Sequence, residues 1–398
     1  MKDVFVIDAL RTPIGKYAGV FSSVRPDDLA AMLLKALIDR NPLLDVNEIE
    51  DVILGAANQA GEDNRNVARM ALLLAGLPVH IGGNTVNRLC ASGLQSIMDA
   101  SRAIQSGDGD IYIAGGVESM TRAPFVMAKA DAAFSRVPEI YDTTIGWRFT
   151  NKNLAAMYHP YSMGETAENV AAQWKISREA QDEFAFESQK RYAAAHAANR
   201  FAEEIQAISI PQKKGDAKII DKDEHPRLSS LEDLAKLKPA FKKEGTVTAA
   251  NSSGINDGSA MLILASEDAV KRMNLKPIAR VVSKSIAGVD PAVMGIGPVP
   301  ATQKALKRAG LSINDIGLFE LNEAFASQGL ACMQELGLNP NLVNVNGGAI
   351  ALGHPLGASG SRISTTLIHE MRKQKVKYGV ATMCIGVGQG AAIVYEAL

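Results

Sequence analysis

The chain has 398 residues, of which 47% are hydrophobic and 21% charged, which is enough for a large core and suggests two or three domains. Because 42 Lys and Arg residues balance 43 Asp and Glu residues, the net charge of −1 gives no reason to expect nucleic acid or a membrane surface as a partner. Three cysteines, at positions 90, 332 and 384, are too few for a disulfide framework and lack the spacing of a zinc or redox site.

The N-terminus contains only a short apolar run, broken by Asp3 and Asp8, and this pattern predicts a strand and not a signal peptide. No apolar run reaches the roughly 18 residues that a spanning helix needs. We therefore expect a reducing, cytoplasmic setting and no membrane contact.

Strands and helices alternate from the N-terminus to about residue 120, which is typical of an α/β layer structure. The predicted strands lie at 4–9, 51–55, 85–89 and 111–115, and the predicted helices at 27–40, 67–74 and 94–105.

The segment 121–250 breaks this alternation. It combines an irregular stretch at 141–153, one helical region at 165–199 and a charged stretch at 213–243. Long insertions of this kind are often functional, so we expect it to lie over the active face.

The alternation then returns, and the two ends of the chain resemble each other. Ala-Ser-Gly begins a long helix at 91–93 and again at 358–360, and a glycine-bearing strand end follows at 113–116 and at 383–386. The common order predicts an internal duplication. The predicted strands here lie at 279–285, 316–321, 380–384 and 391–395, and the helices at 302–308, 326–336 and 359–371.

Cys90 lies in the stretch NRLCASG (87–93), where a strand passes into a helix. The small residues after it leave room for a ligand, and a helix N-terminus favours a thiolate. The alternative is inert packing, since cysteine is among the most buried residue types. A reactive thiolate also needs a base and an anion stabiliser elsewhere in the chain.

Two further segments could supply these groups. His354 is the one histidine of six in a glycine-built turn, and this turn matches neither the P-loop nor the dinucleotide-binding pattern. Cys384 ends a predicted strand before a glycine turn and could transfer protons. The alternatives are a surface histidine and a packed cysteine; Cys332 has no such setting and is assigned to packing.

Asn322 ends another predicted strand, a common place for ligands in α/β proteins, where it could donate to a carbonyl oxygen or hold a water. It could equally form a turn or cap a helix. The small-residue loop at 248–258 suits the close approach of a bulky ligand, or serves as a turn-rich connection.

In these local frames the chain resembles the thiolase family. The resemblance spans nearly the whole chain, and it implies an α/β fold of five layers, α-β-α-β-α, built from two similar halves. The first half would be 1–122 with 251–273, the second 274–398, and an inserted loop domain would occupy 123–250. The matching motifs are NRLCASG (87–93), GGVESM (115–120), NSSGINDG (251–258), LNEAF (321–325), NGGAIALGHPLGASG (346–360) and TMCIGVGQG (382–390).

The resemblance also implies catalytic roles. Cys90 would be the nucleophile that carries the acyl group, and His354 would take its proton. Cys384 would protonate the departing acetyl-CoA carbanion in degradation, or abstract a proton from acetyl-CoA in synthesis. One oxyanion hole would combine His354 with a water held by Asn322, and a second would use the backbone N–H groups of Cys90 and Gly386. We expect His354 and the helix end to lower the pKa of Cys90.

Coenzyme A would be a substrate, and the resemblance implies neither a cofactor nor a metal. It also suggests a homotetramer. The residues expected to contact coenzyme A are Ser253, Met163, Arg227, Ala324 and Phe325.

Two kinds of sequence feature suggest which acyl group the enzyme would cleave: one difference from the short-chain thiolases, and three stretches that resemble another branch of the family. Ser-Met-Gly stands at 162–164 where short-chain biosynthetic thiolases have His-Met-Gly, while 57–78, 122–127 and 142–149 resemble the β-ketoadipyl-CoA thiolase branch. That branch cleaves 3-oxoadipyl-CoA to succinyl-CoA and acetyl-CoA in aromatic degradation. The substrate ends in a carboxylate, so a cationic partner is expected.

Arg148 and Arg65 are the candidates for this partner, and His159 is a third; the alternative is that they are ordinary surface residues. Other functions stay open: a general 3-ketoacyl-CoA or acetoacetyl-CoA thiolase, or a non-catalytic acyl-CoA-binding protein on the same fold. Binding alone needs no paired thiols, which argues against the last. A decarboxylating condensing enzyme is disfavoured because Cys384 stands where a second histidine would be wanted.

Overall fold

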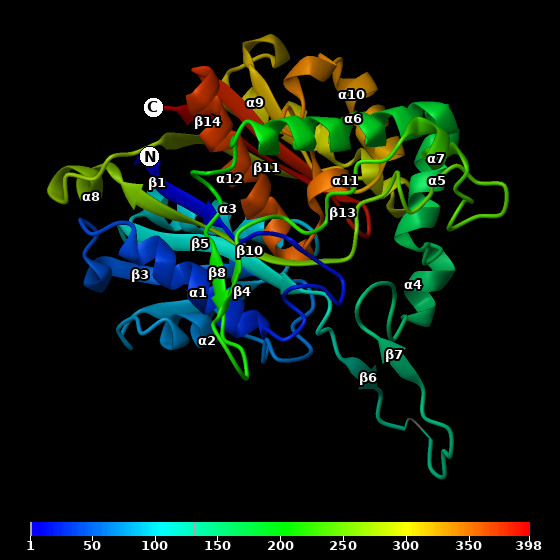
Figure 1. The fold of residues 1–398 in the computed structure, drawn as a ribbon, viewed down its shortest axis with the longest axis horizontal. Helices are drawn as coiled ribbons and strands as arrows, with labels where there is room; N and C mark the ends of the chain where they lie inside the picture. The colour runs from blue at the N-terminus through cyan, green and yellow to red at the C-terminus, as the bar shows by residue number, and fades with distance from the viewer. Residues whose placement is uncertain (1, 131) are drawn as a thin grey trace.

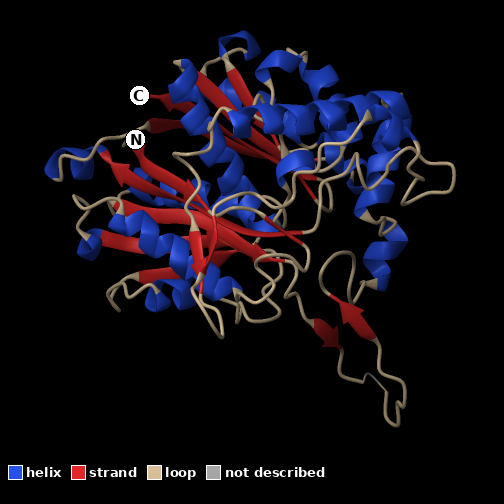
Figure 2. Ribbon diagram, in the orientation of Figure 1, coloured by secondary structure: helices blue, strands red, loops and turns tan. Residues whose placement is uncertain are grey.

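One large mixed sheet runs through the protein, in the order β12-β13-β14-β11-β1-β10-β5-β3-β4, with β2 paired to β10 (Figures 1 and 2). The computed structural model describes residues 2–130 and 132–398. The strands of this sheet are β1 (Val4–Arg11), β2 (Gly15–Lys16), β3 (Ile49–Gly55), β4 (Gly82–Val86), β5 (Ile111–Ser119), β10 (Asn256–Ser266), β11 (Ala279–Gly288), β12 (Leu318–Leu321), β13 (Tyr378–Ile385) and β14 (Gln389–Ala397).

The two halves of the sheet repeat one pairing scheme, as the internal duplication predicts. In the first half β3 is parallel to β5, and β5, β10 and β1 follow as antiparallel neighbours. In the second half β12 is parallel to β13, and β13, β14 and β11 follow in the same way. The halves join where Phe5 and Val6 pair with Arg280 and Ala279.

Helices cover the sheet in three layers (Figure 1). Apolar side chains of α1 and α2 pack on the first half of the sheet, and those of α9 and α10 pack on the second half. Between the halves lie α3 and α12, and α12 is buried without interruption from Gly357 to Met371. The bounds are α1 (Pro26–Asp39), α2 (Val67–Leu74), α3 (Ser92–Ser106), α9 (Pro298–Ala309), α10 (Ala326–Leu336) and α12 (Leu356–Gln374).

The segment 121–250 lies outside the large sheet. Its β6–β7 hairpin projects away from the body at the lower right of Figure 1. The elements are β6 (Phe125–Met127), β7 (Ile140–Asp142), α4 (Lys152–Met157), α5 (Met163–Gln173), α6 (Arg178–Ala197), β8 (Ile208–Ile210), β9 (Lys218–Ile220) and α7 (Leu231–Ala235).

Three sequence-based expectations are wrong in detail. The single helical region at 165–199 is two helices, because Lys175 takes a left-handed φ of 55° and Ser177 caps α6. The strand expected at 85–89 ends at Val86, because Leu89 has a φ of 47° and donates its N–H to the Asn87 side chain.

The small-residue loop at 248–258 runs directly into β10, an eleven-residue strand that was not predicted although it lies between β1 and β5. Two short helices, α8 (Glu267–Arg272) and α11 (Ala349–Leu352), complete the described α-helices. No helix in 2–130 or 132–398 is both long and apolar enough to cross a membrane.

The first turns of α3 and α12 cross so closely that glycine is required at the contact. A Cβ atom on Gly93 would lie 2.7 Å from the carbonyl oxygen of Gly357, and one on Gly360 would overlap the backbone nitrogen of Leu94. Because backbone atoms cannot give way as side chains do, this crossing fixes the spacing of the two helices.

We predict that Gly360→Ala destabilises the protein by about 3 kcal/mol, the cost of overpacking a rigid core, and lowers the thermal unfolding midpoint. Gly288→Ala is the control, because a Cβ atom there is exposed and would meet only the Gly388 oxygen, at 3.9 Å. Equal midpoints for both variants, measured by differential scanning fluorimetry, would contradict this account of the crossing.

Candidate active site

Cys90 lies in a tight turn between β4 and α3 and is half-buried. Ser92 holds the turn, because its Oγ accepts the N–H of Arg88 at 2.9 Å and donates to the carbonyl of Leu89 at 2.7 Å. The left-handed Leu89 directs the chain sharply into the helix. The thiol therefore sits on a short, internally bonded turn at the start of a buried helix.

The electrostatic setting of Cys90 differs from the expectation. Burial raises the pKa of the Cys90 thiol above its ordinary value, and the charge of Glu118 adds to the rise. The backbone N–H groups of Gly386 and of Cys90 itself oppose this rise, but burial outweighs them. The expected lowering of this pKa is thus wrong, and a protonated thiol of this kind would need a base before it could act as a nucleophile.

His354 is held at two points. Its backbone N–H donates to Oδ1 of Asn256 at 2.9 Å, and its Nδ1 lies 2.6 Å from Oγ of Ser359. The Ser359 hydroxyl donates its one hydrogen to the carbonyl of Pro355, at 2.8 Å. With the hydroxyl oriented in this way, Ser359 accepts from Nδ1–H, and this tautomer leaves the lone pair of His354 on Nε2.

Burial lowers the pKa of His354 to about 3, and the positive charge of Arg362 contributes. The ring is consequently neutral at physiological pH, which is the state that a general base requires.

Cys384 and Asn322 end the neighbouring strands β13 and β12. Burial raises the pKa of Cys384 well above its ordinary value, and the nearby thiols of Cys90 and Cys332 raise it further. The N–H of Asn322 donates to the carbonyl of Thr382 at 3.0 Å. Its side-chain amide is buried, and neither Nδ2 nor Oδ1 has a hydrogen-bond partner among the described residues. Such an amide can hold a polar ligand atom or a water.

The residues expected to contact coenzyme A fall into two groups. Met163, Ala324 and Phe325 form one apolar cluster with Cys384, and the N–H of Ser253 donates to the carbonyl of Ala324 at 3.0 Å. Arg227 lies apart from this cluster, at a cavity of about 220 Å³ that is also lined by Leu234, Leu237 and Ala250.

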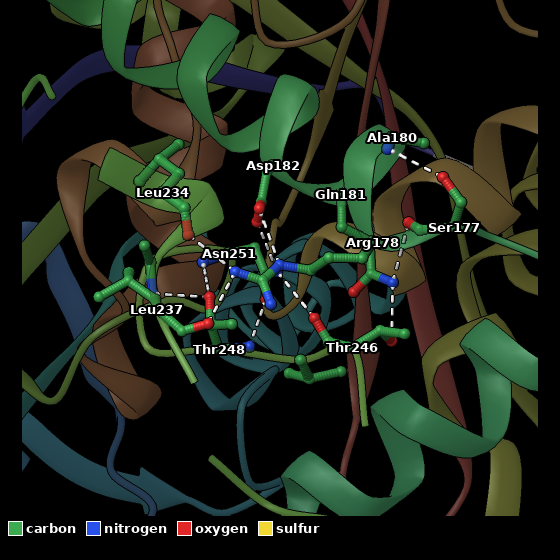
Figure 3. A network of polar contacts seen from close by, with 12 residues as sticks. Ser177, Arg178, Ala180, Gln181, Asp182, Leu234, Leu237, Thr246, Thr248 and Asn251 are labelled. Atoms are coloured by element: carbon green, nitrogen blue, oxygen red, sulfur yellow. Dashed lines mark hydrogen bonds and ion pairs between the residues drawn. The ribbon is translucent and has the colours of Figure 1, made fainter. Parts of the chain in front are cut away.

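A polar network joins this cavity to the loop before Ser253 (Figure 3). Arg178 pairs with Asp182 at 2.7 Å and donates to the carbonyls of Leu234 and Leu237 at the end of α7. Asp182 accepts the side-chain amide of Asn251 at 2.9 Å. The Arg178–Asp182 pair thus fixes α7 and the 246–251 loop relative to each other.

Of the two candidate arginines for the substrate carboxylate, the structure links only Arg148 to the residues around Cys384. Arg148 is half-buried and follows Trp147, whose indole donates to the carbonyl of Tyr161 at 2.9 Å. Tyr161 is two residues before Met163, whose Sδ would lie 3.5 Å from a Cβ atom on Gly386.

Arg65 is exposed in the turn before α2, and His159 is exposed and packs edge-on against Tyr161. Neither Arg65 nor Arg148 forms a hydrogen bond or ion pair within the part of the chain that the structure describes.

Sequence reasoning missed the residues that hold the catalytic candidates. Asn256, Ser359 and Glu118 all lie inside motifs that attract attention, NSSGINDG, GASG and GGVESM. Their composition alone indicates turns and close packing, however, and only the fold shows which backbone groups they reach.

Two family models together match almost the whole chain: the thiolase N-terminal domain matches residues 4–268, and the thiolase C-terminal domain matches residues 275–397. The chain belongs to the thiolase family. It is therefore an acyltransferase, and its α/β sandwich is the expected thiolase fold.

Known proteins support this assignment along the full length. The chain is 57% identical to the 3-oxoadipyl-CoA/3-oxo-5,6-dehydrosuberyl-CoA thiolase of Escherichia coli K12, with 100% of both chains covered. A Bacillus anthracis acetyl-CoA acetyltransferase superposes with a TM-score of 0.94 at 42% identity, covering 100% of this chain and 99% of that one. Human mitochondrial 3-ketoacyl-CoA thiolase in complex with CoA superposes with a TM-score of 0.93 at 42% identity, covering 100% and 98%.

We predict that Ser359→Ala lowers kcat of this thiolase about 10- to 100-fold while KM for CoA stays unchanged, because His354 loses the acceptor that fixes its ring and tautomer. Ser361→Ala is the control: its hydroxyl is also buried in α12, but it donates to the carbonyl of Ala358. Steady-state kinetics would contradict the role of Ser359 if both variants lost the same activity.

Proposed function

We propose that this thiolase cleaves 3-oxoadipyl-CoA with CoA to give succinyl-CoA and acetyl-CoA. The observation that carries the proposal is the 57% full-length identity to a thiolase named for that substrate, against 48% to a 3-ketoacyl-CoA thiolase of Aeromonas hydrophila. Ser162 supports it as well. It caps α5 in a reciprocal pair with Glu165, a local role that an imidazole in its place would not reproduce.

The proposed reaction begins with proton transfer from the thiol of Cys90 to Nε2 of His354. The thiolate attacks the C3 carbonyl, the C2–C3 bond breaks, and its electron pair leaves on C2 of the acetyl-CoA portion. Cys384 gives its proton to that carbanion, and a succinyl thioester remains on Cys90. The raised pKa of Cys384 suits this step, because the site holds a protonated thiol where the proton is needed.

The second half of the reaction restores both thiols. The thiol of CoA gives its proton to the Cys384 thiolate and attacks the succinyl thioester. Cys90 leaves as a thiolate and recovers its proton from the imidazolium of His354. Every proton is returned, so the cycle needs no external acid or base.

We propose two sites for the negative oxygen atoms that form in these steps. In one, His354 acts with a water on Asn322, whose buried and unpaired amide supports the assignment. In the other, the backbone N–H groups of Cys90 and Gly386 act together, and both already lower the pKa of the Cys90 thiol. Donors fixed in advance stabilise developing charge without reorganisation.

We propose that CoA lies along Met163, Ser253, Ala324 and Phe325 and reaches the cavity beside Arg227. The apolar cluster would hold the pantetheine arm, and Arg227, an exposed residue at the cavity whose Nη2 donates to the carbonyl of Ala249 at 2.9 Å, would meet a phosphate. The network of Figure 3 would set the distance between the two parts of this site.

We predict that Asp182→Asn raises KM for CoA about tenfold and changes kcat much less, because the Arg178 and Asn251 side chains lose the carboxylate that joins them. The control is Glu187→Gln on the same helix, which removes a partly exposed pair with Lys190 and Arg191. Equal kinetic effects of the two variants would contradict a specific role for the network.

We propose that Arg148 binds the distal carboxylate of the acyl group, because its segment is bonded to the one that packs on Gly386. Arg65 stays a second candidate, without such a link. Arg148→Ala should lower kcat/KM for 3-oxoadipyl-CoA about 10- to 100-fold and leave acetoacetyl-CoA cleavage unchanged.

The same experiment tests the substrate. The wild-type enzyme should prefer 3-oxoadipyl-CoA over acetoacetyl-CoA and a medium-chain 3-oxoacyl-CoA, and Arg65→Ala serves as the parallel variant. Equal or higher wild-type rates on the neutral substrates would reject the dicarboxylic specificity and leave a general thiolase.

We further propose a homotetramer in the cytoplasm. The projecting segment from β6 to α4 carries many exposed apolar side chains, and such surfaces commonly mark subunit contacts. They include Phe125, Met127, Phe134, Val137, Ile140, Ile145, Phe149 and Met157. A reducing compartment would keep the two catalytic thiols free.

A further inference from the structure

Glu118, at the end of β5, connects the two halves of the protein beside the proposed catalytic groups. Its buried carboxylate accepts the N–H of Ala57 at 2.8 Å and the N–H of Asn58 at 3.2 Å, from the loop after β3. It also accepts the N–H of Gly357 at 2.7 Å, in the first turn of α12. One side chain thus bonds to the backbone of both halves.

Each of these backbone groups leads to a catalytic candidate. The side chain of Asn87 donates to the carbonyl of Ala57 at 2.9 Å, so the Cys90 turn is bonded to the loop that Glu118 holds. Gly357 is three residues after His354 in the chain. The charge of Glu118 also acts directly on the Cys90 sulfur.

The internal duplication gives this contact a counterpart. Aligning Ala-Ser-Gly at 91–93 with 358–360 places Gly357 opposite Cys90. At Cys90, the N–H of Gly386 reaches across from the end of β13 to the sulfur. At Gly357, Glu118 reaches across from the end of β5 to the N–H. The first half therefore presents the Cys90 thiol to the end of β13. At the equivalent position, the second half presents only the backbone N–H of Gly357 to the end of β5.

A neutral acceptor could not replace Glu118 at this place. Three N–H groups converge on it, one of them from the N-terminal turn of α12, where a negative charge is favoured. The neighbouring ionisable groups are Asp63, Cys90 and, beside its strand partner Gly258 on β10, Asp257. Burial raises the pKa of Glu118 to about 7, Asp63 adds to the rise, and the three N–H groups oppose it.

We propose that Glu118 is a positioning residue for catalysis, which clamps the Cys90 turn and the His354 loop together and whose negative charge acts on the Cys90 thiol from a distance. This inference rests on the roles proposed above for Cys90 and His354. Glu118 holds the turn and the loop through their backbone and acts on Cys90 only through its charge, so it does not touch the reacting atoms.

The test compares Glu118→Gln and Glu118→Asp with the wild-type enzyme. The control is Glu370→Gln, which also removes a buried carboxylate. Glu370 lies on α12 itself, about 20 Å along the helix from Gly357, and bonds to Asn346 and Arg200. Two quantities are measured: kcat and KM for CoA, and the pH dependence of Cys90 alkylation by iodoacetamide, with Cys90→Ser identifying the site.

Glu118→Gln should lower kcat by the order of 100-fold at unchanged KM, because an amide cannot accept all three N–H groups. Its alkylation midpoint should move to lower pH, because a negative charge beside the thiol is gone. Glu118→Asp keeps the charge but not the reach, so kcat should fall with no such move. Glu370→Gln should change neither quantity.

Values of kcat within threefold of the wild type for both Glu118 variants would overturn the inference. So would an unchanged alkylation midpoint in Glu118→Gln, because its charge would then not act on Cys90. If the wild-type enzyme cleaves acetoacetyl-CoA but not 3-oxoadipyl-CoA, the proposed substrate fails while the Glu118 comparison proceeds on acetoacetyl-CoA.

Discussion

The first turns of α3 and α12 cross in direct contact between their backbones. The relative position of the proposed catalytic residues Cys90 and His354 depends on this contact. Gly93 and Gly360 allow it, since a methyl group at either position would strike the opposite main chain. Cys90 precedes one helix and His354 precedes the other. The duplication thus creates a symmetric crossing of two buried helices, and the two groups proposed to be catalytic, Cys90 and His354, lie at its two ends.

Burial then sets the chemistry of these groups. It raises the pKa of Cys90 and Cys384 and lowers that of His354 to about 3, so all three are uncharged before substrate binds. An isolated charge in such a site would be costly, whereas proton transfer between neighbouring groups creates charge only when the reaction needs it. The fixed N–H groups and the unpaired amide of Asn322 can then stabilise the oxygen atoms on which that charge develops.

Much of this arrangement can be predicted from the sequence, because glycine-rich turns and strand ends mark where Cys90, His354 and Cys384 lie. The side chains that hold these residues in place through hydrogen bonds cannot be predicted in this way. Asn256 and Glu118 act on backbone nearly one hundred residues or more away, and no local pattern reports such contacts. The pKa of Cys90 was predicted with the wrong sign because a helix end is visible in the sequence, whereas the degree of burial depends on the tertiary fold.

Cys90 is the residue proposed to carry the acyl group that is cleaved from a dicarboxylic substrate. The most direct measurement is mass spectrometry of the enzyme quenched after mixing with 3-oxoadipyl-CoA in the absence of free CoA. We expect one succinyl group on the peptide that contains Cys90, none in Cys90→Ala, and its loss when CoA is added. A succinyl group on Cys384 or Cys332, or acetyl-CoA release with no adduct on Cys90, would contradict the account.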